Sequence, residues 1–173
     1  QTRYIYVELT LSNLIKKAKK LSDFSDIKQG LATGDNDTFI RFWFEVNINK
    51  TKFDKIFDET SNAKWFPYNK GGGYQKFYGN NEFVCNWEND GFEIKEDKLK
   101  RLTLGKILAS NSKPKNTQYY FLKGISFNLT GNFSARFKPN GFIFDVQGSS
   151  LFPADDIILP ILGLLNSKLV NPL

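Results

Sequence analysis

The chain has 173 residues and a net charge of +6, and 40% of its residues are hydrophobic, which is typical of one globular domain with its own core. It has no histidine and a single cysteine, Cys85, so a Ser-His-Asp triad, a histidine metal site, an intramolecular disulfide and a zinc ribbon are excluded. The positive charge favours a polyanionic partner, although solubility alone would also explain a charge of this size.

The absence of methionine predicts that the chain belongs to a longer protein. We therefore expect residues 1–173 to be a single domain excised from a larger chain. The lone cysteine fits a reducing compartment, and we expect the protein to be cytoplasmic. No stretch resembles a signal peptide or a membrane span, because the longest apolar run, residues 157–165, is short and includes Pro160.

Apolar residues three or four positions apart predict an amphipathic helix near the N-terminus, at least over residues 11–20. Four lysines near its end complement the helix dipole and could also contact phosphate: Lys16, Lys17, Lys19 and Lys20. A short strand is expected at residues 22–29. The loop expected at residues 30–37 contains glycine but lacks the GxxxxGK[ST] pattern of a nucleotide-binding P-loop.

Residues 38–47, TFIRFWFEVN, form the strongest predicted strand. Alternate positions from Ile40 to Val46 are apolar, so Arg41 is expected on the opposite face. A guanidinium held there by its strand neighbours could bond guanine O6 and N7 together, which makes Arg41 a candidate DNA-binding residue. Residues 47–63 are more polar and are expected to form a connection.

The densest pattern lies at residues 64–91, KWFPYNKGGGYQKFYGNNEFVCNWENDG, with eight aromatic residues, five glycines and five asparagines. An extended run at residues 65–68, which Pro67 would keep at a sheet edge, is expected to turn at the three glycines. Residues 74–78 would form the return strand. After an asparagine turn, residues 82–87 would form a third antiparallel strand. One face of that strand would carry Phe83, Cys85 and Trp87.

Two interpretations of this sheet stay open. Asparagine amides can read adenine edges, and aromatic rings can stack on unpaired bases. Alternatively, the aromatic residues form a core and the asparagines form turns. On the first interpretation, the candidate DNA-binding residues of this stretch are Lys64, Trp65, Tyr68, Lys70, Asn80, Asn81 and Asn86.

A basic helix is predicted at residues 92–110. Residues 92–117 carry seven basic and three acidic residues, which accounts for +4 of the net charge of +6. Lys98 and Lys100 are therefore candidate phosphate contacts. A solvated helix face would explain the same charge without any ligand.

The C-terminal part is expected to contain short strands and then an apolar helix at residues 158–170. The strands are predicted at residues 119–122, 125–129, 133–137 and 142–146. Arg136 lies in the middle of one of them. It is either paired with a carboxylate such as Asp145 or directed at a ligand such as a base edge.

These elements predict an α+β fold in which small antiparallel or mixed β-sheets are flanked by helices, without βαβ alternation. The sequence contains no self-sufficient active site, no glycine-rich S-adenosylmethionine loop and no NPPY motif. Paired carboxylates such as Asp35 and Asp37 lie in predicted turns or on charged helix faces. Solvated acids explain them better than a cation site, so no catalytic residue and no metal site is expected.

Three segments resemble the C-terminal half of PglX, the adenine-specific DNA methyltransferase of BREX phage-defence systems, and of related type IIG restriction–modification enzymes. They are GLATGDNDTFIRFWFEV, the stretch at residues 64–91, and NFSARFKPNGFIFDVQGSSLFP followed by ILGLLNSKL. The similarity covers nearly the whole chain from about Leu21 onward, in the same order. The LLNSKL segment also resembles target recognition domains of type I specificity subunits.

The resemblance implies a target recognition domain, which would read a short DNA sequence on behalf of a methyltransferase core located N-terminal to this chain. That core would flip out adenine to methylate N6. S-adenosylmethionine would bind to the core, so no cofactor is expected in this chain. The implied partners are double-stranded DNA and the rest of the parent protein. A protein- or carbohydrate-binding β domain with exposed aromatic residues is the alternative.

Overall fold

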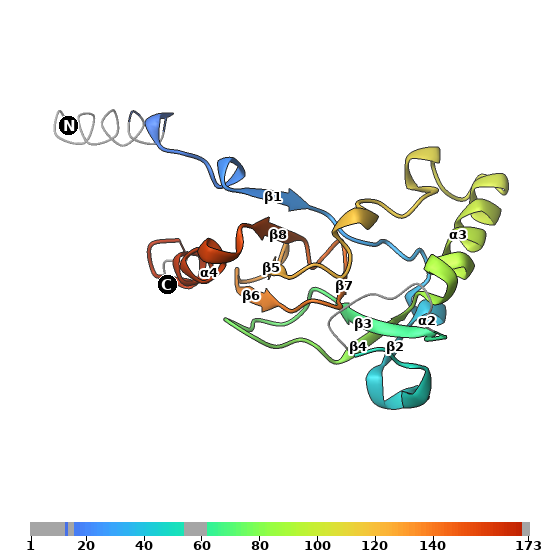
Figure 1. Ribbon diagram of the computed structural model, residues 1–173. Helices are drawn as coiled ribbons and strands as arrows, with labels where there is room; N and C mark the ends of the chain where they lie inside the picture. Colours follow the sequence, from blue (N-terminus) through green and yellow to red (C-terminus); the bar gives the residue numbers. More distant parts are fainter. Residues whose placement is uncertain (1–12, 14–15, 54–61, 171–173) are drawn as a thin grey trace.

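The computed structural model describes residues 13, 16–53 and 62–170, which build two small β-sheets with helices at their margins (Figure 1). Of the helix predicted at residues 11–20, residues 11, 12, 14 and 15 lie outside the described residues; Asn13, Lys16 and Lys17 are helical, and residues 18–20 are not. Among the described residues, no helix is long and apolar enough to cross a membrane. Two small open sheets accompanied by a few helices confirm the predicted α+β fold.

The first sheet is antiparallel throughout, with the strand order β1-β8-β5-β6. Its strands are β1 (Ser25–Lys28), β5 (Gly124–Phe127), β6 (Ala135–Lys138) and β8 (Ser150–Pro153). Helix α4 (Ile158–Asn166) packs on this sheet because its buried apolar residues recur three and four positions apart. The aliphatic core between them consists of Ile125, Ala135, Leu151, Ile158, Ile161, Leu162 and Leu165.

The second sheet is mixed, with the strand order β2-β4-β3-β7 and with β7 parallel to β3. Its strands are β2 (Ile40–Phe42), β3 (Trp65–Asn69), β4 (Phe83–Asn86) and β7 (Ile143–Phe144). The helices beside it are α2 (Asn36–Phe39) and α3 (Glu88–Thr103). The core of this half is mainly aromatic and includes Phe39, Phe66, Tyr68, Trp87, Tyr120 and Phe144.

The strand predicted at residues 38–47 is much shorter in the structure. β2 ends at Phe42, whose N–H donates to Glu45 Oε2 at 2.8 Å, and Trp43–Glu45 form a 3-10 turn. Trp43 N–H still donates to the Glu82 carbonyl beside β4 at 2.9 Å, and the turn then takes the chain out of the sheet. As a result Phe44 does not face the core as predicted, and 65% of its surface is exposed.

Pro67 lies in an interior strand rather than at the predicted sheet edge, because β3 runs between β4 and β7. The short strand β7 pairs only with Tyr68 and Asn69. Position 67 therefore has no strand partner on that side, and its missing N–H interrupts no ladder there.

The return strand predicted at residues 74–78 is absent, and residues 70–82 form a long loop. Phe77 has a φ of 69°, a left-handed conformation that does not fit a continuous strand. Its N–H donates to the carbonyl of Ala135 at 2.9 Å, and its carbonyl accepts from the N–H of Phe137 at 2.8 Å. The loop thus lies along the open edge of β6 and links the two sheets.

In helix α3 residues 89–91 have non-helical dihedral angles, so the regular helix begins at Phe92 as predicted, and it ends at Thr103 instead of residue 110. These three residues are left-handed, and Gly91 has a φ of 70°. A Cβ on Gly91 would lie 2.6 Å from the Trp87 ring, so this close approach requires glycine. After Thr103 the chain turns at Gly105, whose φ of 66° stops the helix.

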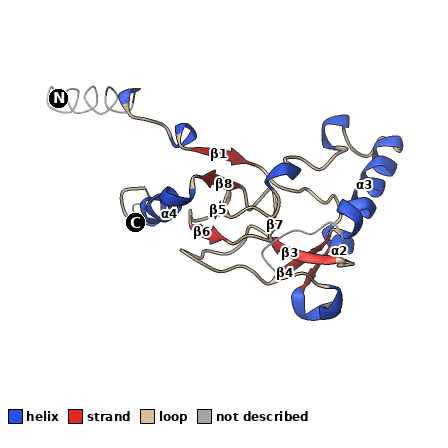
Figure 2. Cartoon of the chain, viewed as in Figure 1, coloured by secondary structure: helices blue, strands red, loops and turns tan. Residues whose placement is uncertain are grey.

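Three of the four later strands predicted from the sequence are present with shifted margins, and Figure 2 shows how much loop separates them. The strands predicted at residues 125–129 and 133–137 are confirmed as β5 and β6, and β7 is the short core of residues 142–146. Residues 119–122 form no strand, whereas β8 was not predicted. The remaining 3-10 turns are Leu21–Asp23, Ile48–Lys50, Ala109–Asn111, Thr117–Tyr119 and Asp155–Ile157.

Candidate nucleic-acid interface

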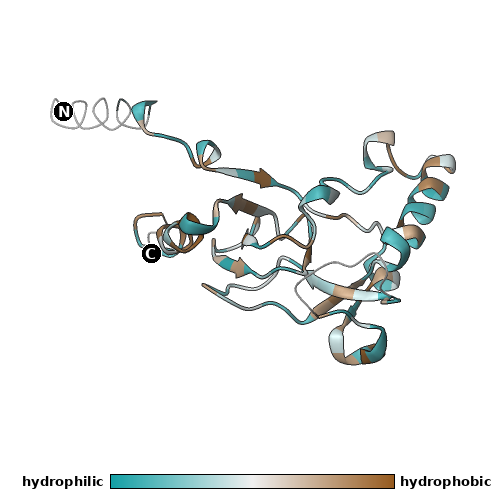
Figure 3. Ribbon diagram, in the orientation of Figure 1, coloured by the Kyte–Doolittle hydropathy of each residue, from teal (hydrophilic) through white to brown (hydrophobic). Residues whose placement is uncertain are grey.

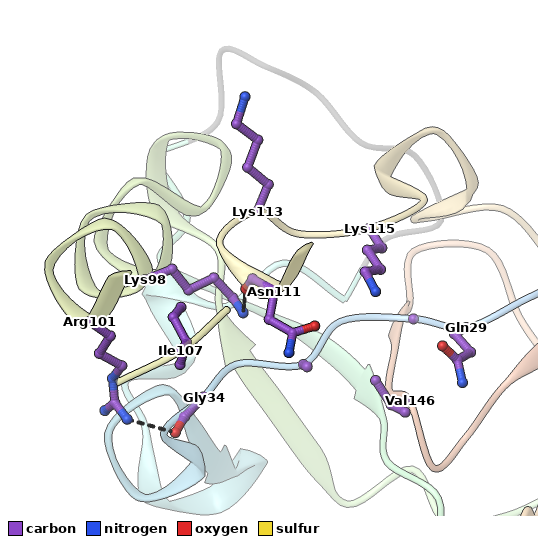
Figure 4. A pocket seen from close by; sticks show the side chains of 11 residues that line it. Gln29, Gly34, Lys98, Arg101, Ile107, Asn111, Lys113, Lys115 and Val146 are labelled. Atoms are coloured by element: carbon purple, nitrogen blue, oxygen red, sulfur yellow. Dashed lines mark hydrogen bonds between the residues drawn. The ribbon is translucent and has the colours of Figure 1, made fainter. Parts of the chain in front are cut away.

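Four basic side chains line one pocket between α3, the loop before α2 and the segment that follows α3 (Figure 4). The pocket has a volume of about 340 Å³, and none of the described residues that line it is acidic. Figure 3 shows that hydrophilic residues dominate α3, in contrast to the apolar α4. The basic residues of this site, called the basic pocket below, are Lys98, Arg101, Lys113 and Lys115.

Lys98 is buried because it lies one turn after Ile94, on the face of α3 that points toward the protein. Only 4% of its surface is exposed, and its Nζ donates to the carbonyl of Asn111 at 3.0 Å. Burial lowers the pKa of Lys98, and the nearby charges of Arg101 and Lys115 lower it further against the opposing effect of Asp97. The ammonium has three N–H donors, so this single bond leaves donor capacity inside the pocket.

Arg101 fastens α3 to the loop on the other side of the pocket. Its Nε donates to Asp97 Oδ2 at 2.6 Å, and its NH1 donates to the carbonyl of Gly34 at 3.2 Å. NH2 lies 3.4 Å from Asp35 Oδ2. The pKa of Asp35 is lowered mainly by hydrogen bonds from Thr38 at the start of α2, and also by the charge of Arg101. Arg101 is therefore a wall of the pocket with its charge already matched.

The segment after α3 brings two exposed lysines to the pocket, Lys113 and Lys115. Neither has a hydrogen bond or an ion pair with another described residue. In Figure 4 the side chain of Lys115 points toward the chain segment between Gln29 and Gly34, and that of Lys113 points away from it. Gly30 itself is held against β7, where an added Cβ would lie 1.8 Å from the Phe144 carbonyl oxygen.

The candidate residues that the sequence indicated are distributed over several places, and of these only Lys98 lines the basic pocket. Lys100 is exposed on α3. Lys64 lies 2.9 Å from Glu93 and 3.6 Å from Glu88, and Asn86 donates to the other oxygen of Glu93 at 2.8 Å. The ammonium of Lys64 and the amide of Asn86 are thus both bound to Glu93, each to a different carboxylate oxygen.

Arg41 and Lys70 lie together at a second, shallow pocket of about 360 Å³. Arg41 NH1 turns back to donate to the carbonyls of Asp37 and Ile40. Lys70 Nζ lies 4.8 Å from the centre of the Phe83 ring. Two carboxylates also line this pocket, so its charge is mixed, unlike that of the basic pocket.

Four more candidates of the central stretch lie in or near the second sheet. Trp65 is half-buried, and Tyr68 is fully buried with its hydroxyl bonded to the carbonyl of Leu31 at 3.0 Å. Asn80 donates to the Gly73 carbonyl within its own turn. Asn81 is half-buried. The core-and-turn interpretation therefore describes Tyr68 and Asn80, whose polar groups are used inside the protein.

Arg136 requires a correction, because its side chain is completely buried and does not reach a surface that a duplex could contact. Its NH2 donates to Asn128 Oδ1 at 2.9 Å, and its NH1 donates to Ser134 Oγ at 3.3 Å. Burial lowers the pKa of Arg136. Of the two predicted roles, base reading does not fit this position. The suggested partner Asp145 is not among its hydrogen-bond partners either.

Sequence reasoning missed three members of the basic pocket: Arg101, Lys113 and Lys115. The signal that pointed toward them was the charge of +4 over residues 92–117. Among the described residues, no group of three or more His, Cys, Asp or Glu side chains is arranged so that it could hold a metal ion. Cys85 is buried, and burial raises the pKa of its thiol, so it is not a reactive group.

The comparison with known proteins identifies relatives of this chain by sequence. The chain is 38% identical over 153 residues to an adenine-specific methyltransferase PglX of Lacticaseibacillus casei, covering 86% of this chain. It is also 38% identical over 149 residues to an adenine-specific methyltransferase BrxX of Escherichia coli, covering 83% of this chain. The chain is a region related to the PglX-like BREX methyltransferases. The resemblance seen in the sequence is thereby confirmed.

The match is a local one with respect to these relatives. The chain spans 12% of the length of the PglX relative and 11% of the length of the BrxX relative. No family model matches the chain. The similarity therefore corresponds to a small part of each of these two methyltransferases.

Proposed function

We propose that this PglX-related region recognises double-stranded DNA, as the target recognition domain of an adenine-specific methyltransferase. The observation that carries the proposal is the basic pocket, whose described lining includes Lys98, Lys113 and Lys115 and no acidic residue. Polyanions bind where such lysines gather, because each contacted phosphate releases condensed counterions. The printed names of the relatives supply the enzyme class, adenine-specific methyltransferase.

Recognition and catalysis would be divided between parts of the parent protein. The sequence has no S-adenosylmethionine loop and no NPPY motif, so cofactor binding and methyl transfer would belong to the rest of that chain. The present region would hold the duplex while the core flips out the target adenine. Its partners would be DNA and the methyltransferase core.

A titration with a fluorescent duplex of mixed sequence tests the proposal. The dissociation constant should rise steeply between two salt concentrations, because lysine–phosphate contacts compete with cations. Calorimetry with S-adenosylmethionine should show no specific binding by this chain alone. An absence of duplex binding at low salt contradicts the proposal, and micromolar cofactor binding contradicts the division of labour.

The loop at residues 70–82 carries exposed aromatic side chains that would suit the alternative function, an interaction module. The same titration tests that alternative. Tyr74, Phe77 and Tyr78 each expose more than half of their surface. Docking of such rings on a neutral protein or carbohydrate does not depend steeply on salt. Weak, salt-independent attachment to the duplex would therefore favour an interaction module over DNA recognition.

A further inference from the structure

We propose that the basic pocket binds a single phosphate group of the DNA backbone, with Lys98 as its buried anchor and Lys115 as its exposed one. This inference rests on the proposed function and makes it specific, because it assigns one phosphate to one pocket. It also changes the role of Lys98. The sequence indicated a flexible surface charge, whereas the structure places the ammonium at the floor of a cavity.

The first argument is the chemistry of the lining. The nitrogen atoms of Lys98 and Lys115 come from segments that are separated along the chain yet line the same space. Asn111 takes one of the three donors of Lys98 through its carbonyl. The remaining donors have no other hydrogen-bond partner among the described residues. A phosphate has several acceptor oxygens and a negative charge, so it matches this set of donors.

The second argument is the charge balance around the pocket. Arg101 is surrounded by the carboxylates of Asp97 and Asp35 at 2.6 Å and 3.4 Å. Those two acids approach the rim on the side of Arg101 and are not part of the lining. Lys98 and the two exposed lysines have no such counterion. Burial is the main cause that lowers the pKa of Lys98; the charge of Asp97 opposes it, and those of Arg101 and Lys115 lower the pKa further. An anion in the pocket would favour the charged form of Lys98.

The third argument is that the walls are held in place. Arg101 links α3 to the Gly34 carbonyl, and the bond from Lys98 to Asn111 links α3 to the segment that follows it. Leu31 N–H donates to the Phe144 carbonyl at 2.7 Å, which ties the loop to β7. A pocket with walls fixed on three sides presents its donors without reorganisation, which favours binding.

Salt-dependent binding of a short duplex tests the proposal in four variants: Lys115→Ala, Lys98→Met, the double variant, and Lys168→Ala as the control. Lys168 is exposed near the end of α4, on the other sheet, so the control removes one charge away from the pocket. Lys115→Ala should weaken binding roughly tenfold at fixed salt. It should also lower the slope of log affinity against log salt by less than about one unit, because Lys98 still contacts the shared phosphate. The Lys168→Ala variant should match the wild type.

The double variant separates one shared phosphate from two independent ones. If Lys98 and Lys115 hold the same phosphate, the double variant should lower the slope by about one unit, and by about two if they contact different phosphates. Circular dichroism confirms that each variant is folded, and methionine fills the buried space of Lys98 without a charge. A slope reduced by about two units would overturn the single-phosphate assignment.

The inference and the proposed function can fail separately. If the wild type binds the duplex and the pocket variants behave like Lys168→Ala, the pocket assignment is wrong and DNA recognition stands. If the wild type binds no duplex, both are wrong. Thermal unfolding in inorganic phosphate and in chloride of equal ionic strength identifies a free ion as the occupant. Selective stabilisation of the wild type by phosphate, without duplex binding, would overturn the assignment to DNA.

Discussion

Strand β6 and helix α3 both bury cationic side chains, and the two elements use them differently. Arg136 and Lys138 on β6 are completely buried, and their charged groups donate hydrogen bonds to acceptors inside the protein. Lys98 on α3 is nearly as buried, yet its ammonium lines a pocket beside exposed lysines. Burial alone therefore does not distinguish a cation enclosed by the protein from one that lines a pocket. The groups around the charge make that distinction.

The surroundings of Lys138 illustrate the structural case. Its Nζ donates to the Leu122 carbonyl and lies 5.2 Å from the Phe152 ring and 5.6 Å from the Phe144 ring. It has no ion pair with a described carboxylate. Burial lowers the pKa of Lys138 to about 7. The two rings and the carbonyl enclose the ammonium and leave no side for a ligand, whereas Lys98 faces a space of about 340 Å³.

The largest expected effect is that of Arg136→Ala on stability. The change removes a fully buried side chain and its donor to Asn128 Oδ1, so the free energy of unfolding should fall by about 3–5 kcal/mol. Urea denaturation followed by circular dichroism measures it. A folded variant of unchanged stability that loses only sequence preference in DNA binding would break the comparison, since Arg136 would then belong with the binding cations.

The second prediction concerns pH and Lys138. The unfolded-state pKa is near the ordinary lysine value and the folded-state pKa is about 7, so the native protein releases the proton first as the pH rises. Below pH 7 lysine is charged in both states and the cost of burying it is complete. Stability should therefore increase from pH 7 to pH 8.5, by about 1.4 kcal/mol per pH unit.

Denaturation of Lys138→Met at the same pH values provides the comparison. The variant buries no ammonium, so it should be more stable than the wild type at pH 7, and its advantage should shrink toward pH 8.5. The difference between the two proteins cancels titrations that both share, such as that of Cys85. An advantage that does not change with pH would mean that Lys138 stays charged in the fold.

A smaller effect is expected for Arg101→Ala, which removes the link between α3 and the loop at Gly34. The ion pairs of Arg101 are partly exposed, with 29% of the side chain accessible, so screening limits their contribution to about 1 kcal/mol. The loss should diminish at high salt. Thermal unfolding at two salt concentrations measures it, and Arg101→Lys should recover only part of the stability because lysine lacks the planar fork.

The smallest effect on stability should come from the exposed lysines. Lys100→Ala and Lys115→Ala should each change the free energy of unfolding by less than about 0.5 kcal/mol, because neither side chain is buried or has an ion pair with a described residue. Urea denaturation of both variants measures this change, and Arg136→Ala measured in the same way gives the value for a buried cation. A large loss of stability in Lys115→Ala would show that this lysine is structural, as Lys138 is.

The candidate site could be predicted only in part from the sequence. The charge of +4 over residues 92–117 indicated the right region, and Lys98 was recognised within it. The pocket itself could not be predicted, because it joins Gly30, the helix α3 and Lys115, which are far apart along the chain. Charge counting locates basic residues in sequence, but not which of them converge in space.

By itself, the sequence determined features that arise from local periodicity and turn chemistry. The alternation at residues 82–87 specified β4, and the apolar spacing after Pro160 specified α4. Local patterns suffice for such elements because neighbouring residues on one face become buried together. The apolar alternation at residues 38–47 nevertheless overestimated the length of that strand, because a local hydrogen bond from Phe42 N–H to the Glu45 carboxylate accompanies its end.

Only the tertiary structure decided the roles of the basic residues. A guanidinium on a strand and an ammonium on a helix look alike in sequence. Whether such a side chain is buried or open to a ligand depends on the residues that pack around it. Burial without a counterion is therefore a property of the assembled fold. Arg136 lies under the loop at residues 70–82, which crosses from the other sheet to the edge of β6. No sequence pattern within β6 predicts that Arg136 is covered, because the covering loop lies about sixty residues away along the chain.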